Sequence, residues 1–142
     1  MHQRSPKIVE LKPVPKGKTG KISRNGIKLE PHEEKTITFL AEHGLDIECL
    51  KKNHTPKSKN ADIVIFGPIW EMKAPESINK ATLKKRMHKA SQQADKVIFD
   101  LRNIKANYES AEKIVLELFL GNHTLRRMIL IKNTGIALDI TK

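Results

Sequence analysis

Two acidic residues and one lysine interrupt the apolar sequence in the middle of the chain. Asp62 begins the run Asp-Ile-Val-Ile-Phe, and Glu71 and Lys73 lie in the following run, Ile-Trp-Glu-Met-Lys. Charges on strand-like apolar sequence are costly to bury unless they pair or coordinate an ion. These three residues therefore indicate a functional site, most simply one that binds a metal ion.

Gly67-Pro68 is the only break between the two runs. A hairpin that turns there pairs Val64 with Glu71 and Asp62 with Lys73. Because side chains alternate along a strand, Asp62, Glu71 and Lys73 then share one face, and a longer loop keeps this arrangement if its length is even. The other face carries the apolar side chains of Ile63, Ile65, Trp70 and Met72.

The composition favours a polyanionic partner. Lysine and arginine outnumber aspartate and glutamate by 27 to 16, which leaves a net charge of +11 at pH 7. Nucleic acid is the first expectation, and an acidic protein or membrane surface the second. Cys49 is the only cysteine, and the six histidines show no HExxH spacing, which argues against a zinc enzyme. Because no apolar run is long enough to span a bilayer, we expect no membrane insertion by this domain.

The chain divides into a leader and one folded domain. Residues 1–30 are rich in lysine, proline and glycine, which predicts a basic arm or linker, and residues 31–142 form the domain. Periodicity and end signals predict helices at 31–43, 79–95 and 107–120, and strands at 45–50, 61–66, 69–73, 96–101, 125–132 and 135–140. This order favours an α/β or mixed α+β fold, with a mixed central sheet flanked by helices.

The predicted helix at 31–43 offers a further carboxylate. Its inward stripe contains Ile37 and Leu40, and Glu33 falls inside the same stripe at 100° per residue. The alternative is that Glu33 and Glu34 only complement the positive end of the helix dipole.

Basic residues surround these acids in the sequence. Arg86, Lys89 and Gln93 lie on a stripe of the 79–95 helix at the rim of its buried face. Lys57 and Lys59 lie in the polar loop that precedes Asp62. Each set suits contacts with phosphates, although solvated surfaces of this kind are common.

The order of these motifs resembles that of the PD-(D/E)xK nuclease superfamily. More specifically, residues 30–102 are similar to the C-terminal tRNase toxin domain of contact-dependent growth inhibition proteins. The motifs that carry the resemblance are His32-Glu33-Glu34, Asn60-Ala61-Asp62, Ile69-Trp70-Glu71-Met72-Lys73 and Ala90-Ser91-Gln92-Gln93-Ala94-Asp95. Ala61 departs from the pattern, because many members have proline there.

The resemblance implies a restriction-endonuclease-like core and assigns roles. Glu33, Asp62, Glu71 and the Met72 carbonyl would bind Mg²⁺ or Mn²⁺. Lys73 would assist the attacking water, with Gln93 as an auxiliary residue. The substrate implied is tRNA in the cytoplasm of a target bacterium, reached as part of a larger secreted or surface protein. A cognate immunity protein is also implied, and the +11 charge suggests that it is acidic.

Two other functions fit the same residues. A DNA endonuclease of the same superfamily would use the same site. A non-catalytic nucleic-acid-binding module would instead keep Asp62 and Lys73 as a structural salt bridge across the hairpin.

Overall fold

The computed structural model describes residues 5–51 and 61–142, with only the backbone of residues 61 and 62 described. Two compact units are present, one formed by Met1–Leu11 and Glu71–Lys142 and the other by Lys12–Trp70. We call these the 71–142 unit and the 12–70 unit. The strand Ile69–Lys73 contributes residues to both.

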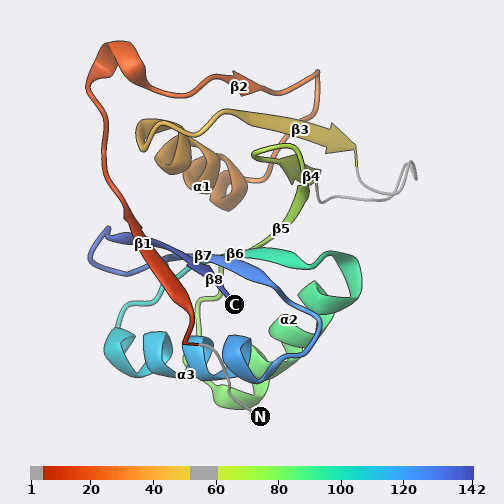
Figure 1. Cartoon of the computed structure of the whole chain (residues 1–142), viewed down its shortest axis with the longest axis vertical. Coiled ribbons are helices and arrows are strands. Elements are labelled where there is room, and N and C mark those ends of the chain that lie inside the picture. The colour runs from red at the N-terminus through yellow and green to blue at the C-terminus, as the bar shows by residue number, and fades with distance from the viewer. Residues whose placement is uncertain (1–4, 52–60) are drawn as a thin grey trace. The chain divides into compact units, whose positions relative to one another are not determined.

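The described residues form eight strands and three α-helices (Figure 1). The helices are α1 (Pro31–Glu42), α2 (Lys80–Gln93) and α3 (Tyr108–Gly121), with a short 3-10 helix η1 (Lys16–Lys18). The strands are β1 (Lys7–Leu11), β2 (Ile22–Ser23), β3 (Ile47–Lys51), β4 (Ala61–Val64), β5 (Ile69–Lys73), β6 (Lys96–Asp100), β7 (Arg127–Ile131) and β8 (Ala137–Thr141).

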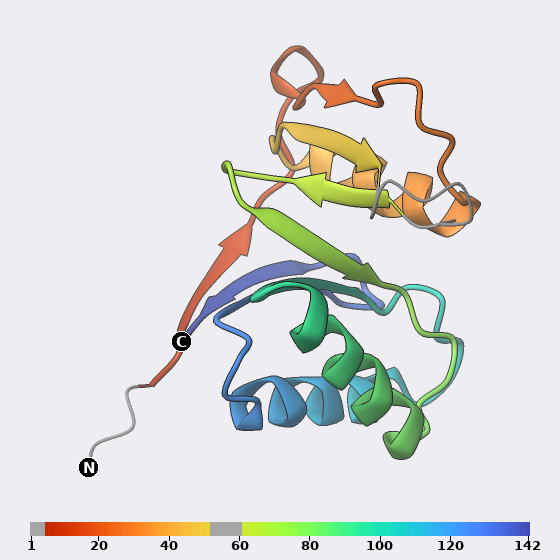
Figure 2. The ribbon, with the colours of Figure 1, turned by 90° about the vertical axis from the view of Figure 1, so that its right-hand side faces the viewer.

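The 71–142 unit is a mixed sheet with the strand order β1-β8-β7-β6-β5. β5, β6 and β7 are parallel, whereas β8 is antiparallel to both β7 and β1. Figure 2 shows α2 and α3 on one face of these strands. The core between the helices and the sheet includes Leu83, Met87, Val97, Phe99, Val115, Phe119, Met128 and Leu130.

The 12–70 unit is built on the order β5-β4-β3-β2, in which β3, β4 and β5 are antiparallel and β2 runs parallel to β3. Helix α1 packs beside β2 and β3 (Figure 1). Fully buried side chains of this unit include Ile37, Leu40, Cys49, Ile63, Ile65 and Trp70. Burial also raises the pKa of the Cys49 thiol, which is typical of a small core residue.

Local sequence explains where α1 begins and ends. Glu30 is the N-cap, Pro31 is the first helical residue, and Glu30 and Glu33 form a capping box. Gly44 follows the helix with φ 85°, and its N–H donates to the Ala41 carbonyl at 2.9 Å. A glycine takes this left-handed conformation without steric cost, so the helix stops there.

The segment predicted to be a basic arm supplies one strand to each unit. β1 pairs with β8, from Lys7 opposite Thr141 to Leu11 opposite Ala137. β2 pairs with β3 through Ile22 and Ile47. Both strands are short edge strands with partners distant in sequence, which explains why apolar periodicity did not reveal them.

Every helix and strand predicted after residue 30 is present, with ends within a few residues of those expected. The predicted mixed α/β (α+β) architecture is therefore confirmed. Among the described residues, none of the helices combines the length and apolar character that crossing a bilayer requires.

Candidate functional site

β5 carries Glu71 and Lys73 on the face of the sheet that the helices cover. Glu71 is in register with Val97, and Lys73 with Phe99, on the parallel neighbour β6. Val97 and Phe99 belong to the core beneath α2 and α3. Since residues in register share a face, the two charged side chains lie on the helix side at the edge of this core.

Glu71 and Lys73 form an ion pair within the strand. Lys73 Nζ lies 3.5 Å from Glu71 Oε1, and the two side chains are 13% and 5% exposed, respectively. A carboxylate this deeply buried requires compensation by a cation, a hydrogen bond or a metal ion. The pair is therefore an unusual feature for a strand that only supports the fold.

The hairpin turns one residue earlier than predicted. Val64 lies opposite Ile69 rather than Glu71, and Ile63 lies opposite Trp70. The central residues of the turn are Phe66 and Gly67, with φ 61° and 101°, and the Ile65 N–H donates to the Pro68 carbonyl at 3.2 Å. A turn with positive φ at both central positions cannot place proline there, because the proline ring fixes φ near −65°.

The predicted alternation survives this correction, because the register moves by an even number of residues. Ile63 and Trp70 lie directly opposite each other and both are fully buried. The Trp70 indole N–H donates to the Ile65 carbonyl at 3.1 Å, which ties the side chain to the turn. The predicted pairing of Asp62 with Lys73 is wrong as a register, and the Asp62 side chain lies outside the described part of the structure.

Glu33 is buried on the inward stripe of α1, as predicted, with 4% of its surface exposed. Its Oε1 accepts a hydrogen bond from the Glu30 N–H at 2.9 Å, which completes the capping box. This bond gives Glu33 a structural role at the helix start. A carboxylate has about four lone-pair sites, so one capping bond does not exhaust its capacity as an acceptor.

Glu34, the neighbouring acid, has a different partner. Arg24 Nε and Nη2 donate to its two carboxylate oxygens at 2.8 and 2.7 Å. This hydrogen bonding lowers the pKa of the Glu34 carboxyl. The pair fastens the segment after β2 to the first turn of α1, where Glu33 lies.

Helix α2 has the predicted buried face, with a polar and basic stripe beside it. Leu83, Met87 and Ala90 are buried, as expected, and Arg86, Lys89 and Gln93 are exposed. Gln93 is the last residue of the helix. Arg86, Lys89 and Gln93 belong to the same unit as Glu71 and Lys73.

The residues predicted for the site are divided between the two units. Glu33 and Asp62 belong to the 12–70 unit, whereas Glu71, Met72 and Lys73 belong to the 71–142 unit, so the convergence of the two sets stays a prediction. Lys57 and Lys59 lie outside the described residues. Among the described side chains, which do not include the Asp62 carboxylate, no group of three or more His, Cys, Asp and Glu residues is placed to hold a metal.

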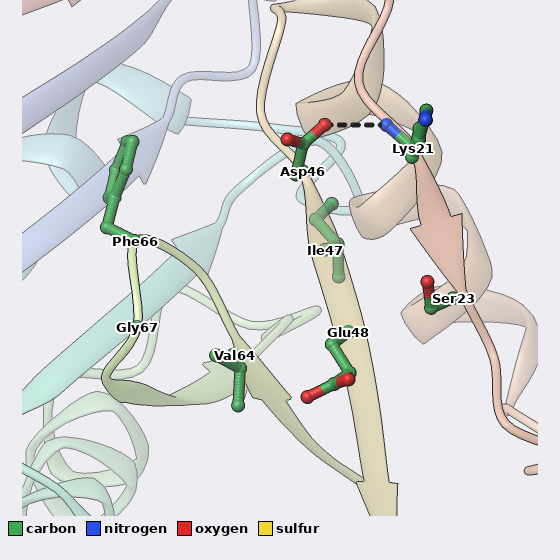
Figure 3. Close-up of a pocket in the computed structure, with 8 residues that line it drawn as sticks. All are labelled: Lys21, Ser23, Asp46, Ile47, Glu48, Val64, Phe66 and Gly67. Carbon is green, nitrogen blue, oxygen red and sulfur yellow. Dashed lines mark hydrogen bonds between the residues drawn. The ribbon is translucent and has the colours of Figure 1, made fainter.

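A separate pocket lies in the 12–70 unit, with a volume of about 380 Å³. Figure 3 shows side chains from β2, β3 and the turn after β4 around it, with the Asp46 carboxylate accepting a hydrogen bond from the Lys21 N–H at 2.9 Å. The residues that line it are Lys21, Ser23, Asp46, Ile47, Glu48, Val64, Phe66 and Gly67. None of the residues predicted for the site is among them, and no local motif indicated this pocket because three separate segments form it.

Comparison with known proteins identifies the family. The model of the contact-dependent growth inhibition CdiA C-terminal domain matches residues 59–136, more than half of the 142 residues. The chain belongs to this family. As a CdiA C-terminal domain it is a toxin domain that inhibits target bacteria. The match includes Asp62, Glu71, Lys73 and Gln93 and begins after Glu33.

A solved structure agrees with the fold of this CdiA C-terminal domain. It is described as a CdiA-CT/CdiI toxin and immunity complex from Burkholderia pseudomallei, and the chain matches it with a TM-score of 0.64 and 20% sequence identity. The alignment covers 87% of this chain and 100% of the other. At this identity the likeness establishes the fold alone. No curated protein matches the chain in a sequence comparison. The resemblance to the C-terminal toxin domain of contact-dependent growth inhibition proteins is confirmed. The tRNase activity and membership of the PD-(D/E)xK superfamily stay predictions.

Proposed function

We propose that this CdiA C-terminal domain is a metal-dependent endoribonuclease that cleaves tRNA in the cytoplasm of target bacteria. The observation that carries the proposal is the buried Glu71–Lys73 pair on β5, with its ammonium 3.5 Å from the carboxylate. The PD-(D/E)xK motif ends in an acid and a lysine two residues apart, which is the spacing of Glu71 and Lys73. In a toxin family, we consider this catalytic role a better explanation of the buried pair than a purely structural one.

The donor set suits a hard divalent cation. Glu33, Asp62 and Glu71 offer carboxylate oxygens, and the Met72 carbonyl offers another oxygen ligand. Mg²⁺ or Mn²⁺ bound there would lower the pKa of a water molecule and neutralise charge on the phosphate. In this proposal Glu33 contributes although its Oε1 also serves the capping box of α1.

Lys73 and Gln93 act on the reacting groups. The Lys73 ammonium, held beside Glu71, orients the attacking water or stabilises the charge that develops on the phosphate. Gln93, at the end of α2, is an auxiliary hydrogen-bonding group for the same phosphate. Lys57, Lys59, Arg86 and Lys89 bind neighbouring phosphates of the RNA.

We also propose a cognate immunity protein as partner. The similar structure from Burkholderia pseudomallei is described as a complex of a toxin with its immunity protein. Because this chain carries a net charge of +11, an acidic partner would be attracted and oriented by its field. We further propose delivery as part of a larger secreted or surface-displayed protein, which membership of the CdiA C-terminal domain family supports.

A cleavage assay tests the proposal and separates it from its alternatives. The protein is incubated with total tRNA or duplex DNA, in Mg²⁺, Mn²⁺ or chelator, beside Lys73→Ala and Asp62→Ala. Lys105→Ala is the matched control, since Lys105 is an exposed lysine of the 71–142 unit. We expect metal-dependent cleavage of tRNA that both site variants abolish and the control retains.

The other outcomes are equally informative. Cleavage of DNA alone would favour a DNA endonuclease with the same residues. RNA binding without cleavage under any metal condition would contradict both enzymatic functions and favour a binding module.

A further inference from the structure

The exposed side of α2 carries positive charge only. Its sequence KATLKKRMHKASQQ contains four lysines and one arginine and no acidic residue. With Leu83 and Met87 turned into the core, Lys80 and Lys84 lie on one flank, at 100° per residue, and Lys85 lies at the outermost position. Each of these three lysines is exposed, and the site described above uses none of them.

This charge pattern has a cost for the helix. Lys80 and Lys84 are four residues apart, as are Lys85 and Lys89, and like charges at this spacing destabilise a helix by about 0.2–0.5 kcal/mol per pair. The neighbouring helix α3 mixes signs, with Glu109, Glu112 and Glu117 beside Lys113. An exposed helix face that served only solubility would be expected to carry both acidic and basic residues, as α3 does.

The chemistry of the α2 face favours a nucleic acid over a protein. Protein interfaces are anchored by exposed aromatic or apolar side chains and are depleted in lysine. The large exposed apolar residues of the described structure lie elsewhere, for example Phe66, Tyr108 and Leu120. Lysines one helical turn apart, about 5–6 Å, instead suit the regular row of charges on a phosphate backbone.

We propose that Lys80, Lys84 and Lys85 form a second RNA-binding surface that contacts the phosphate backbone away from the cleaved bond. This inference rests on the proposed ribonuclease function. Lys80 and Gln93 begin and end a 14-residue helix, so their Cα atoms are roughly 20 Å apart at 1.5 Å per residue. An RNA that contacts both ends of α2 must therefore span roughly 20 Å along the helix.

The test is the salt dependence of RNA binding, measured in chelator so that no cleavage is needed. The full chain binds labelled total tRNA between about 50 and 200 mM salt, and the slope of log K against log salt counts the phosphates neutralised, at about 0.7–0.9 per contact. We expect the variant Lys80→Gln/Lys84→Gln/Lys85→Gln to bind more weakly, with a slope smaller by about 2–3. Glutamine preserves helix propensity, and circular dichroism verifies the fold.

A matched control removes the same charge from elsewhere on the same unit. Lys105→Gln/Lys113→Gln/Arg126→Gln changes three exposed basic residues outside α2 and should leave the slope close to that of the parent. Equal slopes for the two triple variants, or an unchanged slope for the α2 variant, would overturn the proposal. So would an α2 variant that binds RNA normally but has lost affinity for the immunity protein.

The two proposals fail separately. If the parent chain binds tRNA but does not cleave it in the presence of Mg²⁺ or Mn²⁺, the ribonuclease function is contradicted. The salt dependence of RNA binding still decides the role of α2. If cleavage is confirmed and the α2 variant binds RNA with the same salt dependence as the parent, only the second RNA-binding surface is contradicted.

Discussion

Lys73 places its ammonium 3.5 Å from the Glu71 carboxylate on the same strand, although both side chains are largely buried. Burial of two charges costs more than their attraction returns unless further contacts or a ligand complete the site. The pair is thus the feature of β5 on which the proposed nuclease function rests.

The first prediction concerns that pair and stability. Lys73→Ala leaves the buried Glu71 carboxylate without its ammonium, so we expect the free energy of unfolding to fall by about 1–3 kcal/mol. Urea denaturation followed by circular dichroism measures the change. The free energy of unfolding should fall far less in Lys105→Ala, because Lys105 is exposed. An equal fall in the two variants would contradict a stabilising role for the Glu71–Lys73 ion pair.

A second prediction rests on a close backbone approach. A Cβ atom added at Gly20 would lie 1.8 Å from the Leu45 carbonyl oxygen, whereas one at Gly17 would meet nothing within 4 Å. We expect Gly20→Ala to lower the free energy of unfolding of the 12–70 unit by about 2–4 kcal/mol. Gly17→Ala should change this free energy by less than about 0.5 kcal/mol. The fluorescence of Trp70, the only tryptophan, reports unfolding of this unit. Similar midpoints for the two variants would contradict the observed packing.

The turn of the hairpin makes a third prediction. Phe66 has φ 61° at the first central position, where asparagine before glycine is strongly preferred. Phe66→Asn and Phe66→Val both remove the ring, so their difference isolates the backbone. We expect the asparagine variant to be more stable by about 1–2 kcal/mol, because a β-branched residue resists the left-handed conformation. Equal stability in urea would show that the turn does not hold this geometry in solution.

The Arg24–Glu34 pair predicts a dependence on pH. The pKa of Glu34 is lowered in the folded protein by hydrogen bonding from Arg24. The contribution of the pair to stability is therefore complete above the unfolded glutamate pKa, about 4.3, and is lost as the pH falls through the lower folded value. We expect Glu34→Gln to lower the urea midpoint at neutral pH and to differ progressively less from the parent in acid.

The control for this effect is the same substitution made in an Arg24→Gln background. Without the guanidinium, the difference that fades in acid should be much smaller, since only the interaction of the Glu34 carboxylate with the helix dipole remains. A constant difference at all pH values in the parent background would contradict the assigned cause.

Local features of the fold followed from the sequence. Pro31 and Gly44 bound α1 as predicted, and the alternation in β5 correctly separated Trp70 and Met72 from Glu71 and Lys73. These features depend on neighbours within one or two turns or on the two-residue period of a strand, which periodicity records directly.

Features that depend on distant segments did not follow. The pattern Gly67-Pro68 predicts a turn one residue later than the observed turn at Phe66 and Gly67, and this shifts the predicted register of the hairpin by two residues. β1 was missed because its partner is β8, at the other end of the chain. The requirement for glycine at position 20 comes from the Leu45 carbonyl, which no local pattern reveals.

The central claim is that the charges on β5 belong to a nuclease site, and one measurement tests it most directly. The rate of tRNA cleavage in Mg²⁺ is compared between the parent chain and Glu71→Gln, which keeps the side-chain size, with the exposed Glu109→Gln as the control. We predict that Glu71→Gln folds and loses activity by about 10²–10³-fold, while Glu109→Gln cleaves like the parent. A folded Glu71→Gln variant that cleaves tRNA at the parental rate would contradict the account.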